Sequence, residues 1–258
     1  VLALPQFGSA LIAPGQQTAE VSEGALQAFV RQTWKNDRFP FWMNVGRIER
    51  STGVYIGNGY VLTAAHVGVG PFKLSDGSLY QPVKGTSRLF QNHDGTTADL
   101  LLFRVHFRAS DSIAKLRSVP LTTAPPKLGR NILLLGGGAG GNSESRQGFT
   151  WTDDYRVRWG VNKIEQIYTA PMSTNDFHSF GYACKFHRGS ANCQAAPGDS
   201  GGAAFHFNTR SKRWELAGII VAVDSEFGAA RFGNQTYIAD PALFRKQISV
   251  AYRPTTRN

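Results

Sequence analysis

Short apolar stretches, many of them alternating with polar residues, recur along most of the chain and are bounded by turn-forming residues. In the first half they cover residues 42–48, 54–62, 79–83 and 100–105. In the second half they cover residues 132–135, 156–161, 164–168, 203–207, 214–223 and 234–238. Stretches of this length and period are typical of β-strands, so the pattern predicts an all-β protein.

Apolar residues at helical spacing are found near the two ends of the chain. Ser22, a good N-cap residue, precedes a predicted helix with Leu26, Phe29, Val30 and Trp34 on one face. Asp240 is expected to cap a final helix that has Pro241 in its first turn. The apolar face of this final helix consists of Leu243, Phe244, Ile248 and Ala251. Both helices are expected to pack on the strands.

A length of 258 residues suits two small β-barrels that share an interface, and 41% hydrophobic residues suffice for their cores. Residues 120–128 contain Pro125-Pro126 and are interpreted as an extended linker between the barrels. The predicted organisation is an N-terminal extension with a helix (1–40), a first β-barrel (41–124), a second β-barrel (125–240) and a C-terminal helix with a tail (241–258). Residues 1–20 are either the end of a signal peptide or a loosely ordered arm.

Charge and hydropathy narrow the class of protein. No apolar stretch approaches the ~18 residues of a membrane span. A net charge of +10 predicts attraction to anionic surfaces. The basic residues are scattered along the sequence, as in Arg31, Lys35, Arg104, Arg158, Arg188, Arg213 and Arg245. They form neither a patch nor a recognisable nucleic-acid module, so a solvated basic surface and no nucleic-acid partner are expected.

The segment Pro197-Gly198-Asp199-Ser200-Gly201-Gly202 has the composition that a nucleophilic serine requires. Gly198 allows the backbone to turn so that its N–H and that of Ser200 face one hole, where they could hold an oxyanion. Gly201 and Gly202 keep side chains away from an attacked carbonyl. The alternative interpretation is a glycine-rich turn with an idle serine.

A base and an acid occur earlier in the chain. His66 follows Thr63-Ala64-Ala65 at the end of a predicted strand, although a lone histidine in such a place is more often structural. Asp99 directly precedes the apolar run Leu100-Leu101-Leu102-Phe103, and a buried carboxylate needs a partner such as an imidazole. Asp94 lies in a polar loop and is the weaker candidate for this acid.

Histidine, aspartate and serine in these three contexts resemble the chymotrypsin/trypsin family of serine peptidases, from about residue 41 to about residue 252. The resemblance implies two antiparallel six-stranded β-barrels and a secreted or periplasmic endopeptidase that cleaves protein or peptide substrates. It further implies His66, Asp99 and Ser200 as the catalytic triad, with the N–H groups of Gly198 and Ser200 as the oxyanion hole. No cofactor and no metal are expected. The alternative function is an inactive homologue that binds a protein or an anionic polymer.

Family members made as zymogens have a mature terminus whose amine pairs with the acid before the serine, here Asp199. The nearest similar segment is Asn44-Val45-Gly46-Arg47, inside the chain. Either the chain is cleaved there, or Asp199 finds another partner, and we favour the second.

The resemblance also suggests a specificity pocket. Gln194, six positions before the serine, would lie at its base, and Val223 and Gln235 would form its walls. An uncharged, shallow pocket predicts small or medium uncharged residues on the acyl side of the cut bond. A shift of one residue in the alignment would bring in the carboxylate of Asp224 and favour a basic residue instead.

Two further patterns are open to more than one interpretation. Cys184 and Cys193 lack the spacing of a zinc site and predict a local disulfide in an oxidising compartment, or else two free thiols. The glycines of residues 136–141 follow a strand and match G-x-G-x-x-G, but no amphipathic helix comes after them. They are therefore interpreted as a mobile loop of the second barrel rather than a dinucleotide site.

Overall fold

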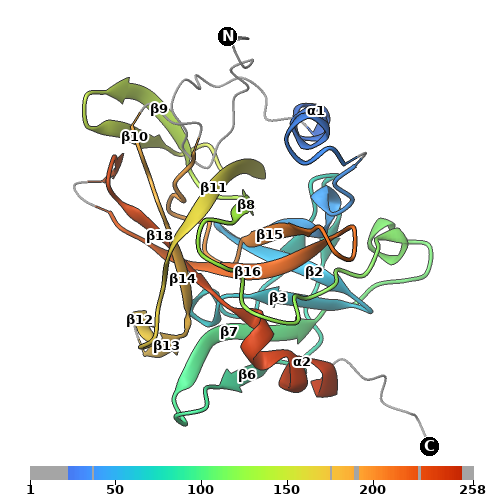
Figure 1. The fold of residues 1–258 in the computed structure, drawn as a ribbon. Coiled ribbons are helices and arrows are strands. Elements are labelled where there is room, and N and C mark those ends of the chain that lie inside the picture. Colours follow the sequence, from blue (N-terminus) through green and yellow to red (C-terminus); the bar gives the residue numbers. More distant parts are fainter. Residues whose placement is uncertain (1–22, 37, 175, 189–191, 226–227, 252–258) are drawn as a thin grey trace, which may run out of the picture.

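The computed structural model describes residues 23–251, except residues 37, 175, 189–191 and 226–227. Most of this part is β-structure, and the helices α1 (Glu23–Trp34) and α2 (Arg245–Ala251) lie at opposite ends of the molecule (Figure 1). The first predicted helix is confirmed, and the second begins as a 3-10 helix, Pro241–Phe244, which Asp240 caps and which continues into α2. The predicted cap Ser22 and the predicted arm or signal remnant, residues 1–20, lie outside the described residues. None of the described helices combines the length and apolar character that crossing a membrane requires.

The first half of the chain forms a curled antiparallel sheet in the order β5-β4-β1-β2-β3-β7-β6. Its strands are β1 (Val45–Ile48), β2 (Ser51–Gly57), β3 (Tyr60–Thr63), β4 (Phe72–Lys73), β5 (Leu79–Tyr80), β6 (Arg88–Gln91) and β7 (Thr97–Arg104). Directly after β5, Val83 N–H donates to Arg104 O at 2.8 Å and Gln81 O accepts from His106 N–H at 2.8 Å. These bonds bring the β5 side of the sheet back to the end of β7, so the sheet curls into the first barrel.

The second half closes into a six-stranded barrel in the order β11-β14-β18-β16-β15-β8. Its strands are β8 (Asn131–Gly136), β11 (Arg158–Ile167), β14 (Gly181–Lys185), β15 (Ala203–Asn208), β16 (Arg213–Val223) and β18 (Gln235–Ala239). A smaller sheet contains β9 (Gly140–Ser145), β10 (Gly148–Thr152) and β17 (Ala229–Arg231), and a ribbon pairs β12 (Met172–Thr174) with β13 (Phe177–Ser179). The expected chymotrypsin-like double barrel is thus confirmed.

Aromatic side chains attach the N-terminal extension to the second barrel. Phe29 of α1 lies 5.2 Å from Trp159 between ring centroids, and Trp34 lies 4.9 Å from Trp214. Leu26 and Val30 of the same helix are fully buried. Because aromatic pairs add to the free energy gained by burying apolar area, this contact fixes α1 on the barrel, as predicted.

Several predicted elements have different limits in the structure. The single strand predicted over residues 54–62 is a hairpin, because Asn58 and Gly59 both have positive φ angles, 51° and 81°, and form the two-residue turn between β2 and β3. The two strands predicted over residues 156–161 and 164–168 are one strand, β11. Leu243, predicted on the buried face of the final helix, is 51% exposed.

Candidate active site

His66 and Asp99 are brought together by two neighbouring strands of the first barrel. Asp99 lies within β7, and His66 lies in the short 3-10 helix Ala65–Val67 that follows β3. The Asp99 Oδ2 atom is 2.7 Å from His66 Nδ1, and Oδ1 accepts a hydrogen bond from His66 N–H at 3.0 Å. Asp99 therefore holds both the ring and the backbone of His66, which defines the orientation of the imidazole.

The side chains of Asp99 and His66 differ in burial. The Asp99 side chain is fully buried, whereas 19% of the His66 side chain is exposed. The alternative acid, Asp94, is exposed and accepts hydrogen bonds from the backbone N–H and hydroxyl of Thr96 in its own loop. The structure thus supports Asp99, and not Asp94, as the partner of His66.

The loop that carries Ser200 is joined to the first barrel through Thr52 of β2, a fully buried residue. Thr52 N–H donates to Ser200 O at 2.9 Å, and Thr52 Oγ1 donates to Gly198 O at 2.8 Å. Thr52 O accepts from the Thr63 hydroxyl at 2.7 Å, three residues before His66. This chain of bonds connects the serine loop of one barrel to the segment of the other barrel that presents His66.

The N–H groups around the serine divide into two sets. Those of Asp199, Gly201 and Gly202 donate to Ala196 O, Ile220 O and Asp199 O at 3.0, 2.8 and 2.8 Å. Within the part of the chain that the structure describes, the N–H groups of Gly198 and Ser200 have no acceptor. Gly198 has a φ of 90°, and a Cβ there would collide with Arg50 O, so the turn requires glycine. The two free donors are those that the sequence predicts for an oxyanion hole.

The acid before the serine has partners inside the chain. Asp199 is 1% exposed, and its carboxylate accepts from Gly138 N–H and from Ala196 N–H, each at 2.8 Å. Burial raises the pKa of Asp199 to about 6, although both hydrogen bonds and the charge of Arg158 favour ionisation. Arg158 Nη1 donates to Gly138 O at 2.8 Å, so Gly138 lies between the two charged groups.

Asp154 forms an ion pair with Arg158, in which Asp154 Oδ2 lies 2.8 Å from Arg158 Nη2. In the segment 44–47, the alternative source of a new terminus, residues 45–47 belong to β1 (Val45–Ile48). Asp199 therefore has a cation and two amide donors without cleavage at that segment.

The glycine run of residues 136–141 lies partly in strands of the second half of the chain. It ends β8, turns, and begins the β9–β10 hairpin, so no nucleotide-binding helix follows it. A Cβ at Gly136 would overlap the carboxylate of Asp199, and one at Gly138 would lie 2.6 Å from Asp199 N. The glycines are needed because the chain passes directly over the acid next to the serine.

Comparison with known families agrees with this geometry. The family model described as Trypsin matches residues 31–240, which is most of the chain. The chain belongs to the trypsin family. A search of curated proteins found no match.

The predicted pocket residues of this trypsin-family chain gather around Asp224. Gln194 is fully buried and its Nε2 donates to Asp224 O at 3.0 Å, while Gln235 N–H donates to Asp224 Oδ2 at 2.9 Å. Val223, the last residue of β16, directly precedes Asp224 and is half-buried. The Tyr237 hydroxyl donates to Asp224 Oδ1 at 2.9 Å. Burial and this bond raise the pKa of Tyr237, so its hydroxyl remains a donor.

The disulfide predicted between Cys184 and Cys193 is absent from the structure, in which both are free thiols. Each is fully buried in an apolar cluster with residues such as Ile164 and Ala195. Burial raises the pKa of both thiols, so neither is a reactive thiolate at neutral pH. They act as small apolar side chains in the core of the second barrel.

Sequence reasoning missed two residues that shape this site, Thr52 and Arg158. Thr52 is an ordinary strand residue in the sequence, and its four hydrogen-bond partners come from both barrels. The scattered basic residues predict a solvated surface, but the side chain of Arg158, one of them, is only 9% exposed. The available signal was the position of Arg158 inside a predicted strand, residues 156–161, rather than in a loop.

Proposed function

We propose that the chain is a serine endopeptidase in which His66, Asp99 and Ser200 form the catalytic triad. The observation that carries the proposal is the pair of hydrogen bonds from His66 to the buried Asp99. It is supported by the serine loop, which is bonded to the same barrel through Thr52 and has two unused N–H donors. Membership of the trypsin family also supports this reaction class.

In the proposed mechanism, Ser200 Oγ attacks the carbonyl carbon of the substrate while His66 Nε2 accepts the hydroxyl proton. The Asp99 carboxylate stabilises the imidazolium that forms. The N–H groups of Gly198 and Ser200 hold the developing oxyanion, a contribution typically worth ~10²–10³ in kcat for one donor. His66 then donates the proton to the leaving amine. In the second half of the reaction water attacks the acyl-enzyme, and His66 accepts a proton from this water and returns it to Ser200 Oγ.

We infer a preference for small or medium uncharged residues on the acyl side of the cut bond. Gln194, at the expected base of the pocket, has no charge to offer, and its amide is bonded to Asp224 O. Both carboxylate oxygens of Asp224 already accept bonds from Tyr237 and Gln235, which reduces what they can offer to a basic side chain. Steady-state rates on matched Ala, Val, Phe and Arg substrates test the preference, and an Arg substrate favoured by about tenfold would refute it.

A fluorophosphonate probe tests the catalytic proposal, because it labels only an activated serine. We expect labelling and ester hydrolysis in the wild-type chain, and a loss of roughly 10⁴-fold or more in kcat for Ser200→Ala. Ser87→Ala is the matched control, since Ser87 is exposed and lies outside the site. A wild-type chain that is folded but unlabelled would favour the alternative, an inactive homologue that serves as a binding module.

We also propose a secreted or periplasmic location, which rests on family membership alone. The disulfide that would have supported it is absent. Detection of the mature protein in the culture medium or periplasmic fraction of its source would test the location.

A further inference from the structure

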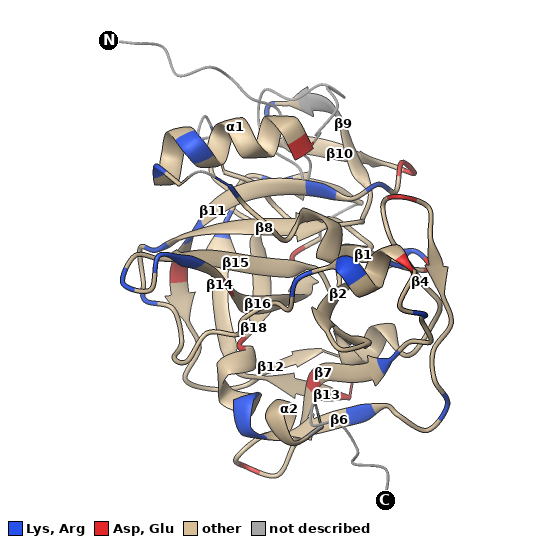
Figure 2. Cartoon of the chain, turned by 90° about the vertical axis from the view of Figure 1, so that its right-hand side faces the viewer, with Lys and Arg blue, Asp and Glu red and all other residues tan. Residues whose placement is uncertain are grey.

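A basic trough runs along one side of the molecule, and none of the residues proposed for catalysis lines it. It consists of three adjoining hollows, of which the first two share Ser118, Pro120 and Arg213. The second and third share Arg245 and Ser249. Figure 2 shows α1 and α2 at the two ends of this side, with basic segments in blue between them.

The lining of the basic trough is strongly unbalanced in charge. Its basic side chains are Arg38, Lys115, Arg117, Lys212, Arg213, Arg245 and Lys246. Among the described residues that line it, the only carboxylate is that of Glu23, 3.8 Å from Arg38. Seven basic side chains and one carboxylate give the lining a formal charge of +6, in a chain whose net charge is +10. Charges that look scattered in the sequence are therefore gathered by the fold.

These cations are available to a ligand. All of them are exposed, and within the described part of the chain Lys115, Arg117 and Lys212 take part in no ion pair. Lys212 lies in the tight β15–β16 turn with a φ of 54°. Repulsion among unpaired like charges in a hollow costs stability, so an arrangement of this kind favours an anion that neutralises several of them at once.

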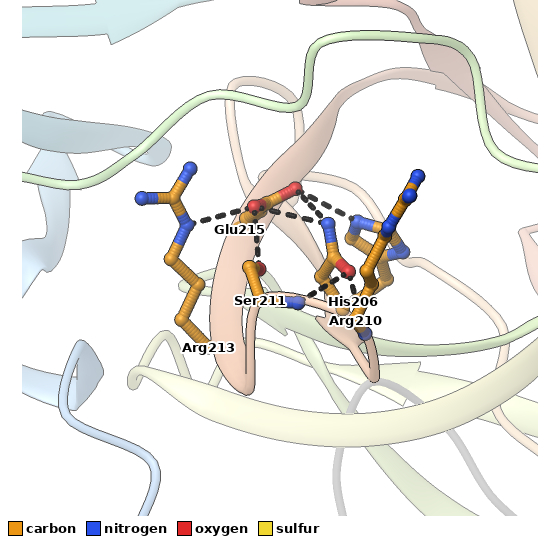
Figure 3. Close-up of polar contacts among 6 residues, drawn as sticks. His206, Arg210, Ser211, Arg213 and Glu215 are labelled. Carbon is orange, nitrogen blue, oxygen red and sulfur yellow. Dashed lines mark hydrogen bonds and ion pairs between the residues drawn. The ribbon is translucent and has the colours of Figure 1, made fainter.

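Arg213, at the junction of the first two hollows, is held in place by Glu215 (Figure 3). Its Nε donates to Glu215 Oε1 at 2.8 Å, and 55% of its side chain is exposed. Burial alone would raise the pKa of Glu215, but hydrogen bonds from Arg213, Asn208, His206 and Ser211 keep it below its ordinary value. The ionised Glu215 thus positions Arg213 through Nε and leaves both Nη groups free to bind an anion.

We propose that the basic trough binds a linear anionic polysaccharide, through the sulfate or carboxylate groups along its chain. A row of joined hollows suits an extended polymer better than a single small anion. The aromatic residues of the lining, Phe41 and Trp214, are only 5% and 2% exposed. They offer no surface on which bases could stack, and stacking is what single-stranded nucleic acids gain from such grooves. The proposal is independent of the catalytic one, because no residue proposed for catalysis lines the trough.

The test measures binding of a fluorescein-labelled heparin dodecasaccharide by anisotropy at several NaCl concentrations, with unlabelled polygalacturonate as a carboxylate-only competitor. All proteins carry Ser200→Ala, so the result does not depend on whether the chain is a peptidase. The trough variant combines Lys115→Gln, Arg117→Gln and Lys212→Gln. The matched control combines Lys73→Gln, Lys84→Gln and Arg88→Gln, which removes the same charge from exposed residues of the first barrel.

We expect the trough variant to lose about tenfold or more in affinity at 0.1 M salt, and its slope of log affinity against log salt to fall by about 2–3. The control should lose less than about threefold. Equal losses in the two variants, or no salt-dependent binding by the parent, would overturn the proposal. So would tighter binding of a single-stranded oligonucleotide, polyglutamate or anionic lipid vesicles of matched charge. In the active enzyme, saturating oligosaccharide should leave hydrolysis of a small ester within about twofold.

Discussion

Replacing Thr52 by valine should disturb the orientation of the serine loop while leaving all three proposed triad residues in place. Valine has nearly the same shape as threonine, so the backbone bond from residue 52 to Ser200 O is retained. The change removes only the hydroxyl, which donates to Gly198 O and accepts from Gly137 N–H, both at 2.8 Å. These two bonds fix the turn that presents one of the proposed oxyanion donors.

The magnitude follows from the burial of the two groups left without a partner. The Gly137 N–H group is buried, and an unsatisfied buried donor costs about 1–3 kcal/mol. The Gly198 carbonyl is partly exposed and can bind water, so its loss costs less. We expect about 2–4 kcal/mol less stability, together with a fall of about 10–100-fold in kcat and little change in KM, because the oxyanion donors act in the transition state.

Thr122→Val is the matched control. Thr122 is also buried, at 1% exposure, but its hydroxyl has no hydrogen-bond partner among the described residues. Its replacement should leave kcat unchanged and stability unchanged or slightly higher. Urea denaturation and steady-state kinetics on an ester substrate provide both readouts, and Thr52→Ser should retain most of the activity. If Thr52→Val kept kcat within twofold of wild type, Thr52 would not orient the loop.

Three other predictions use the same two assays or a thiol titration. Arg158→Gln should raise the pKa of Asp199 above about 6 and reduce kcat at pH 7, with partial recovery at higher pH; a pH-independent loss would contradict this. The pKa of Asp240 is raised by burial to about 6 from 3.8, so its contribution to stability is full below pH 3.8 and lost as pH rises through 6. Asp240→Asn should therefore remove about 1 kcal/mol of the stability lost between pH 5 and 7, and an unchanged pH dependence would contradict that origin. Cys184 and Cys193 should not react with a thiol reagent in the native protein and should both react, without reductant, after unfolding; no reaction after unfolding would mean that they are bridged.

The parts of the fold that the sequence predicted are those that depend on local patterns. Strand alternation and the helical spacing of Leu26 and Val30 report on burial one element at a time, and the structure buries these positions as expected. The pairing of His66 with Asp99 was predictable because each residue lies beside a recognisable apolar run of the sequence. The segments around His66 and Ser200 each include flanking residues that are typical of the family, which is why they identified it.

The errors arise where a local signal was overlooked or had two meanings. Asn58-Gly59 is a strong hairpin signal, but the apolar residues on both sides made residues 54–62 resemble one strand. Two nearby cysteines are compatible with a bridge or with two buried thiols, and spacing does not distinguish these because packing decides which forms. The trough shows the same limit for charge, since Arg38, Lys115 and Lys212 become neighbours only through folding.

The partner of Asp199 illustrates why spacing cannot locate a buried counter-charge. Family resemblance directs attention to a chain terminus, whereas the structure places the cation Arg158 in β11 and connects it to Asp199 through Gly138. That bridge exists because Gly138 has no Cβ, which would otherwise lie 2.7 Å from Asp199 Oδ1. The glycine run that imitates a nucleotide-binding pattern is therefore what allows the acid to be satisfied inside the chain. It follows that the loop of Gly198 and Ser200 can be ordered by Arg158 and Thr52 together, without a terminal amine.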